Sequence, residues 1–403
     1  MRLHKNLVFA TISALEDIFN QGQLADKTVE RVLKQDKRWG SRDRGFIAET
    51  TYDIVRWKRL YAKIAGVRPP YSREDLFRVF AVWAVLRGIS LPDWKQFSGT
   101  PVRRIKGKFD ELSRIRKYRE SIPDWLDSLG AKTLGEELWT AEIAALNQQA
   151  EVILRVNTLK TTRSELQQLL AADKLETETI KGYPNALRLK KRANVFASPT
   201  FKAGLFEVQD AASQLVAPFL QISPGDFVID ACAGAGGKSL HLAALMENKG
   251  QLLALDIYPG KLKELKRRAR RNGVHNTETR HIDSQKVIKK LTQRADKLLL
   301  DVPCTGTGVL RRNPDAKWKL QPEFLDRVIQ TQKTILRDYS KMVKKGGTMV
   351  YATCSILRQE NSDQVQEFLQ SDAGEEFSLE EEQSIFASEA GFDGFYMARL
   401  KRK

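Results

Sequence analysis

Short apolar runs alternate with helix-length segments from residue 204 onward, and this alternation limits the possible folds more than any other feature. Strands that alternate with helices in sequence form a mainly parallel sheet with helices on both faces. The sequence therefore predicts an α/β, Rossmann-like domain over residues 204–403. The expected strands lie at 227–230, 251–256, 298–301 and 347–354, and the expected helices at 238–246, 261–272, 322–343 and 358–370.

The rest of the chain divides into two further predicted parts. Apolar residues recur at helical spacing through residues 1–120, and the run DLFRVFAVWAVLR at 75–87 is expected to be a largely apolar helix. Residues 121–203 are expected to form a small α/β segment. A chain of 403 residues is long enough for such a three-part organisation.

The charge balance indicates a polyanionic partner. Lysine and arginine number 67 against 50 aspartate and glutamate residues, a formal charge of +17. Such a surface favours nucleic acid, because each cation on a phosphate releases condensed counterions, although excess charge also serves solubility. Cations concentrate at 103–119 and at 261–271. Each segment is either a solvated helix face or a phosphate-binding face.

Several classes of protein are disfavoured. The apolar runs are too short to cross a membrane, and residues 1–20 carry Glu16 and Asp17 rather than a secretory signal, so we expect a cytoplasmic protein. The three cysteines show no CxxC spacing and the four histidines show no ligand pattern, so we expect no metal site. Nothing in the sequence sets the oligomeric state, and a monomer is consistent with it.

A glycine-rich segment, DACAGAGGKS at 230–239, connects an expected strand to an expected helix. Glycines there let the backbone turn tightly and approach a ligand at the helix N-terminus. The dinucleotide pattern GxGxxG does not match. The phosphate loop GxxxxGK[ST] almost matches, but Cys232 stands where its first glycine is required.

Two acids at later strand ends favour a nucleoside ligand without a triphosphate. Asp256 ends the next strand, where a carboxylate can accept hydrogen bonds from both ribose hydroxyls. Asp283 follows another expected strand and can meet an adenine amino group. A glycine turn followed by two strand-end acids suits S-adenosylmethionine.

Cysteines follow two further expected strands, in the turn DVPC at 301–304 and in ATCS at 352–355. A single such cysteine is often only a small buried apolar residue. Two of them at strand ends, where open α/β sheets bind ligands, favour catalysis. A thiolate that adds to carbon 6 of cytosine makes carbon 5 reactive toward a methyl sulfonium. A carboxyl group such as Asp301 can stabilise the charge that develops at ring nitrogen 3.

The motifs DACAGAGGKS, DVPCTGTGVLRRNPD and YATCSILRQEN resemble the signatures of the RsmB/Sun family of RNA cytosine-5 methyltransferases. Further segments that resemble the family are RVN at 155–157, VQDAAS at 208–213 and GFDGFYMAR at 391–399. The resemblance implies a Rossmann-like class I methyltransferase domain, a NusB-like RNA-binding domain at the N-terminus and a ribosomal RNA substrate of the small subunit. The family loop commonly reads APGGK, whereas Ala235 here replaces the proline, which costs rigidity but no backbone donor.

The resemblance also implies residue roles. Cys354 matches the family's nucleophile and Cys304 the cysteine that helps to release product. The implied contacts to S-adenosylmethionine are Cys232, Ala233, Gly234, Ala235, Gly236, Gly237, Lys238, Asp256, Asp283 and Asp301.

The target cytosine is expected to be single-stranded or flipped, because stacking hides the ring face that a thiolate approaches. Arg311, Arg312 and Asn313 follow the Cys304 motif and are expected to hold the flanking RNA backbone. Two alternatives stay open. A DNA cytosine-5 methyltransferase uses a Pro-Cys nucleophile and lacks the second cysteine. A ribosome-assembly factor can keep the fold and RNA binding without turnover.

Overall fold

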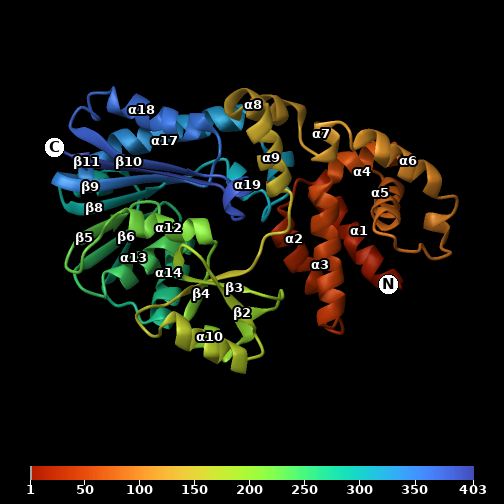
Figure 1. The fold of residues 1–403 in the computed structure, drawn as a ribbon, viewed down its shortest axis with the longest axis horizontal. Coiled ribbons are helices and arrows are strands. Elements are labelled where there is room, and N and C mark those ends of the chain that lie inside the picture. The colour runs from red at the N-terminus through yellow and green to blue at the C-terminus, as the bar shows by residue number, and fades with distance from the viewer. Residues whose placement is uncertain (1) are drawn as a thin grey trace. The chain divides into compact units, whose positions relative to one another are not determined.

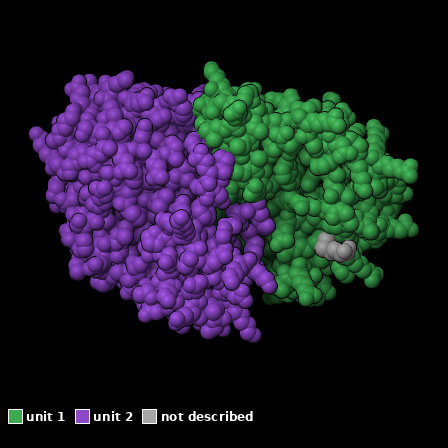
Figure 2. All heavy atoms as spheres, in the orientation of Figure 1, with its two compact units in different colours: residues 1–148, 310–321 green, residues 149–309, 322–403 purple. Residues whose placement is uncertain are grey.

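The computed structural model describes residues 2–403, which form two compact units (Figures 1 and 2). The first unit contains the chain up to Gln148 together with Leu310–Gln321, and the second contains Gln149–Val309 and Pro322–Lys403. This division cuts the predicted middle segment 121–203 in two, because residues 124–146 are helical and pack within the first unit. None of the helices within residues 2–403 is both long and apolar enough to span a bilayer.

The first unit is helical, as the periodicity of residues 1–120 predicts. The expected helix at 75–87 is α5 (Arg73–Leu86), which begins with a capping box between Ser72 and Asp75. Its other helices are α1 (Lys5–Asn20), α2 (Ala25–Leu33), α3 (Ser41–Arg56), α4 (Lys58–Ala65), α6 (Val102–Leu112), α7 (Arg116–Arg119), α8 (Asp124–Leu134), α9 (Glu136–Leu146) and α16 (Ala316–Lys319), with the 3-10 turn η1 (Lys95–Phe97).

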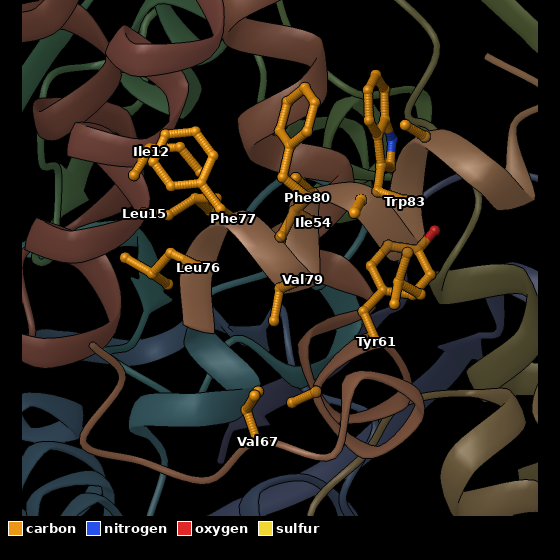
Figure 3. Close-up of a cluster of buried hydrophobic side chains, with 14 of the residues drawn as sticks. Ile12, Leu15, Ile54, Tyr61, Val67, Leu76, Phe77, Val79, Phe80 and Trp83 are labelled. Atoms are coloured by element: carbon orange, nitrogen blue, oxygen red, sulfur yellow. The ribbon is translucent and has the colours of Figure 1, made fainter. Parts of the chain in front are cut away.

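The core of the first unit is built around α5 (Figure 3). Phe77 and Phe80 from this helix lie among Ile12 of α1 and Ile54 of α3. The ring of Phe77 also meets that of Phe97 edge-on, 5.9 Å between centroids. A nearly continuous apolar sequence is needed here because α5 is covered on most of its sides.

The second unit opens with a four-stranded antiparallel sheet in the order β2-β3-β1-β4. Leu166 and Leu170 of its helix pack against Leu187 and Phe206 of the strands. The short strands β2 and β4 are not expected from the sequence, because neither has a distinct apolar alternation. The elements are β1 (Ile153–Val156), α10 (Arg163–Ala172), β2 (Thr177–Ile180), β3 (Tyr183–Leu189), η2 (Val195–Ala197), α11 (Pro199–Lys202) and β4 (Phe206–Val208).

A seven-stranded sheet follows in the order β10-β11-β9-β8-β5-β6-β7. The five strands from β9 to β7 are parallel, and β11 and β10 add antiparallel pairs at one edge. The mainly parallel sheet expected from the alternation is therefore confirmed. The strands are β5 (Phe227–Asp230), β6 (Gln251–Asp256), β7 (Thr277–His281), β8 (Ala295–Asp301), β9 (Val343–Thr353), β10 (Phe377–Ile385) and β11 (Phe395–Arg402).

Helices cover both faces of this sheet (Figure 1). One face packs against α12 (Ala211–Phe219), α13 (Gly237–Leu245) and α14 (Pro259–Asn272). The other packs against α15 (Gln285–Lys289), α17 (Pro322–Tyr339) and α18 (Ser362–Leu369). Short turns η3 (Thr307–Val309), η4 (Ser340–Met342), η5 (Arg358–Glu360) and α19 (Ala387–Ala390) complete the unit.

Candidate active site

The strand order places a ligand site where β5 and β8 lie side by side. The chain continues from β5 to β6 on one side, whereas β8 and β9 lie on the other, so this is the switch point at which open α/β sheets bind ligands. Asp230 ends β5 and Asp301 ends β8. A cavity of about 1060 Å³ opens beyond these strand ends, lined in part by Cys232, Lys238 and Asp301.

The glycine-rich loop fills the gap between β5 and α13 as the sequence predicts. Gly234 and Gly236 take left-handed backbone conformations, with φ of 55° and 89°. A Cβ at Gly236 would lie 2.5 Å from Cγ of Leu265, so a side chain there would collide with α14. The backbone thus passes close to the N-terminus of α13 and leaves the cavity open on its other side. This cradle fits the nucleoside part of S-adenosylmethionine.

Asp256 lies at the end of β6 and lines the cavity. Its two carboxylate oxygens accept backbone N–H donors, from Gly234 at 2.8 Å and from Tyr258 at 2.7 Å. A carboxylate offers about four acceptor positions, so two remain for ribose hydroxyls. The expected ribose contact is therefore compatible with the geometry and remains a prediction.

Two exposed apolar residues beside Asp256 were not expected from the sequence. Ile257 and Tyr258 are 54% and 55% exposed, and both line the cavity. Large apolar side chains left open at a cavity indicate a binding surface, here one suited to a flat ring. In the sequence, only their position directly after Asp256 at the end of a strand could have indicated that these two residues line a ligand site.

Asp283 is not among the residues that line the cavity, whereas its neighbours Ile282 and Gln285 are. Its carboxylate accepts a hydrogen bond from the hydroxyl of Ser284 at 3.0 Å. The predicted contact to the adenine amino group therefore requires this side chain to change its orientation.

Lys238 and Asp301 form an ion pair inside the cavity, with 2.6 Å between Nζ and Oδ2. Burial alone would lower the pKa of Lys238, but the charge and hydrogen bond of Asp301, with smaller effects of Cys354 and Asp230, raise it. The ammonium group also lies 5.2 Å from the ring centroid of Phe395. The sequence assigned Lys238 to the cofactor alone, whereas the structure places its charge beside Asp301.

Asp230 lies beneath the loop and is 1% exposed. Burial raises its pKa to about 7, although the Ser239 hydroxyl donates to its Oδ2 at 2.6 Å. Burial likewise raises the pKa of Cys232, so this thiol is an unreactive lining of the cavity. Neither side chain carries the features of a nucleophile.

The two remaining cysteines come together although 50 residues separate them. Sγ of Cys304 lies 3.2 Å from Sγ of Cys354, and both side chains are half-buried. The hydrogen bond to Cys354, burial and the nearby charges of Cys354 and Glu360 raise the pKa of Cys304. Parallel neighbours β8 and β9 end at the same sheet edge, which is why the two turns meet.

The residues expected to hold RNA next to Cys304 lie in the first unit. Arg311 is 5% exposed, and its guanidinium donates to the backbone oxygen of Ala145 at 2.9 Å. Arg312 is half-buried and Asn313 is exposed. A phosphate contact from Arg311 would require this hydrogen bond to break, so the structure favours the exposed Asn313 over Arg311 for that role.

A buried cluster connects the four-stranded sheet to the cofactor loop. Arg155 on β1 donates to the backbone oxygen of Gly237 at 2.6 Å. Asn157 donates to backbone oxygens of Gly204 and Asn272. The sequence matches at 155–157 thus hold the loop and α14 in place. Within residues 2–403 no group of three or more histidine, cysteine or acidic side chains is arranged to hold a metal ion.

Two protein-family models match parts of this chain. The family model for 16S rRNA methyltransferase RsmB/F matches residues 217–401. A second model, the ferredoxin-like domain of RsmF/B-like methyltransferases, matches residues 122–196. The second match spans the predicted middle segment, including α8 and α9, which pack within the first unit.

Curated relatives cover most of the chain. It is 32% identical over 390 residues to the probable ribosomal RNA small subunit methyltransferase B of Synechocystis sp., covering 88% of this chain and 87% of that protein. The Escherichia coli ribosomal RNA small subunit methyltransferase B is 34% identical over 324 residues, covering 78% and 75%. The crystal structure of PH0851 superposes with a TM-score of 0.84 at 26% identity, covering both chains fully. The chain therefore belongs to the RsmB/Sun family of S-adenosylmethionine-dependent methyltransferases.

Proposed function

We propose that this enzyme methylates carbon 5 of a cytosine in the RNA of the small ribosomal subunit, in the cytoplasm. The observation that carries the proposal is the pair of sulfurs, Cys304 and Cys354, 3.2 Å apart beside the Lys238–Asp301 ion pair. The relatives named above as small-subunit ribosomal RNA methyltransferases support the choice of RNA. The formal charge of +17 supports a polyanionic substrate.

Cys354 acts as the nucleophile. Its thiolate forms a bond to carbon 6 of the cytosine, and the electron pair of the 5,6 double bond shifts into the ring. Asp301, once its carboxyl group carries a proton, donates a hydrogen bond to ring nitrogen 3, and Lys238 beside it offsets the negative charge that develops there. Carbon 5 then has the electron density that methylation requires.

The residues that would hold the cofactor line the cavity beyond the end of β5, namely Cys232, Ala233, Gly234, Ala235, Gly237, Lys238 and Asp256. When bound, S-adenosylmethionine supplies an electrophilic methyl group. The loop would orient the cofactor relative to the base held by Cys354, and orientation of this kind accounts for much of a rate enhancement.

Product release breaks the bond between Cys354 and carbon 6. The proton on carbon 5 passes to a water molecule, and the electron pair of that carbon–hydrogen bond restores the 5,6 double bond. The electron pair of the bond between carbon 6 and sulfur leaves with Cys354, which departs as a thiolate. Cys304 is the side chain beside the departing sulfur, where its S–H can donate a hydrogen bond to that thiolate. This places the two cysteines in different steps of one reaction.

Replacement of each cysteine separates these roles. Cys354→Ala is expected to give neither turnover nor a covalent RNA complex, because a methyl side chain cannot add to carbon 6. Cys304→Ala is expected to attack and methylate but to release product slowly, so a protein–RNA adduct accumulates. Denaturing gel electrophoresis with RNA and S-adenosylmethionine measures both.

The alternatives predict other patterns in the same gel. A DNA-type enzyme would form an adduct through Cys304, so Cys304→Ala would abolish the adduct and Cys354→Ala would retain it. An assembly factor without turnover would give no adduct in either variant and none in the unaltered protein. Bisulfite sequencing of ribosomal RNA from cells with and without the gene then identifies the methylated cytosine.

A further inference from the structure

Glu360 is a charged residue at the end of η5 that has no role in the reaction steps above. It is fully buried, with 0% exposure. Its carboxylate accepts four hydrogen bonds, which occupy the acceptor positions of both oxygens. The donors are the backbone N–H of Thr305 at 2.8 Å, the Thr305 hydroxyl at 2.5 Å, the Ser355 hydroxyl at 2.5 Å and the Gln332 side chain at 3.1 Å.

These donors connect Glu360 to the two turns that carry Cys304 and Cys354. Thr305 directly follows Cys304, and Ser355 directly follows Cys354. Gln332 on α17 also donates to the backbone oxygen of Pro303 at 3.0 Å, the residue before Cys304. One buried carboxylate thus bridges the backbone on either side of the sulfur pair.

A second set of contacts holds the same two turns together. The Thr307 and Ser355 hydroxyls are 2.9 Å apart, and the backbone N–H of Gly308 donates to the oxygen of Cys354 at 2.9 Å. A Cβ at Gly308 would lie 2.8 Å from that oxygen, so the turns approach too closely for any side chain. Glu360 is the charged member of this packed network.

We propose that Glu360 is a positioning residue that sets the spacing of the two cysteines and, by its negative charge, keeps the proton on Cys304 while Cys354 attacks. The inference rests on the proposed roles of the cysteines. A carboxylate near a thiol disfavours ionisation of that thiol. The shared turns transmit any shift of Glu360 to both sulfurs.

The surroundings of Cys304 support the proposed effect of the Glu360 charge on the Cys304 thiol. Cys354 and Glu360 face its thiol and disfavour its ionisation, whereas the backbone N–H of Gly306 favours it. The buried hydroxyl of Tyr351 also interacts with both Cys304 and Glu360. Cys354 contributes most to the raised pKa of Cys304, followed by burial and then by Glu360. Glu360 carries a charge that can be removed without deleting a reacting sulfur.

Glu360→Gln removes the charge and preserves the shape. The Thr305 and Ser355 hydroxyls can accept as well as donate, so the new amide NH₂ keeps both as partners while its oxygen accepts from the Thr305 N–H and Gln332. We expect iodoacetamide to alkylate Cys304 about tenfold faster than in the unaltered protein at a fixed pH below its midpoint, equivalent to about one pKa unit. Peptide mass spectrometry across a pH series follows each cysteine separately.

Glu360→Ala removes the bridge itself. We expect methyl transfer to fall by about a hundredfold, because a misplacement near 1 Å has effects of that size. Affinity for S-adenosylmethionine, measured by calorimetry, is expected to stay unchanged, because Glu360 does not line the cofactor cavity. Glu367→Gln, seven residues along the chain at an exposed ion pair with Lys333, is the control and should match the unaltered protein.

An unchanged pH midpoint for Cys304 in Glu360→Gln would overturn the inference, whether or not Glu360→Ala folds. Normal turnover of a folded Glu360→Ala would overturn it as well. The alkylation measurement needs no RNA. If the unaltered protein fails to methylate RNA, the proposed function is refuted. The pH dependence of Cys304 alkylation would still decide the role of Glu360.

Discussion

Asp256 is the residue on which the cofactor assignment can be tested most directly. Asp256→Ala is expected to weaken S-adenosylmethionine binding by about 1.5–3 kcal/mol, because charge-assisted hydrogen bonds to the ribose are lost. Isothermal calorimetry measures this change. Asp283→Ala is the matched comparison, because its carboxylate lies outside the cavity lining and is expected to matter less. Unchanged affinity in Asp256→Ala would refute the ribose contact.

Asp230 predicts a pH dependence of stability. Its folded pKa of about 7 exceeds the ordinary value of 3.8, so the folded carboxyl binds a proton that the unfolded carboxyl has already released. Folding therefore takes up a proton between these values, and the free energy of unfolding falls as pH rises from about 4 to about 7. Asp230→Asn should remove this loss, on the order of 2–4 kcal/mol. Urea unfolding at several pH values measures the free energy of unfolding of the unaltered protein and of Asp230→Asn. The same pH dependence in the two proteins would contradict the prediction.

At the scale of a single element, α14 shows that a run of cations need not be one surface. Arg268 and Arg271 both pair with Glu207, whose side chain is 5% exposed, whereas Lys263 and Lys266 are exposed. The sequence could not separate these two groups. The partner on β4 becomes visible only when the helix is packed against it.

The two groups of cations are expected to behave differently when neutralised. If α14 binds phosphates, Lys263→Gln with Lys266→Gln should reduce the slope of log affinity for RNA against log salt by about two. Arg268→Gln with Arg271→Gln should instead destabilise the fold by about 3 kcal/mol or more, because Glu207 stays buried without a cationic partner and keeps only the hydrogen bond from Asn272. Salt-dependent RNA binding and urea unfolding give the two readouts. An unchanged slope for the lysine pair would leave α14 as a solvated face.

At the scale of the whole molecule, the recessed cysteines predict selectivity for unpaired RNA. Cys304 and Cys354 are both half-buried at the base of their turns, so a base must leave its stack to bring carbon 6 to a sulfur. The protein is expected to methylate a cytosine in a loop much faster than the same cytosine within a duplex. Transfer of a radioactive methyl group to matched RNA hairpins measures the ratio, and equal rates would contradict the prediction.

Local sequence patterns predicted much of the second unit. Alternating apolar strands and helices indicated the sheet, and β5 and β6 lie at the predicted residues. The same patterns indicated which residues follow strand ends. Because parallel strands share one carboxyl edge, that was enough to place the glycine loop, Asp256, Asp301 and both cysteine turns at one edge of the sheet.

Tertiary packing decided what no local pattern contains. The 3.2 Å approach of Cys304 to Cys354, the pairing of Lys238 with Asp301 and the bridge through Glu360 each join residues far apart in sequence. Packing also assigns Leu310–Gln321 to the helical unit and buries Arg311, although the run Arg311–Asn313 has the composition of an RNA contact. Periodicity reports which way a side chain faces along its own element. The identity of the buried partner depends on the fold of the whole chain, and for charged groups that partner determines their role.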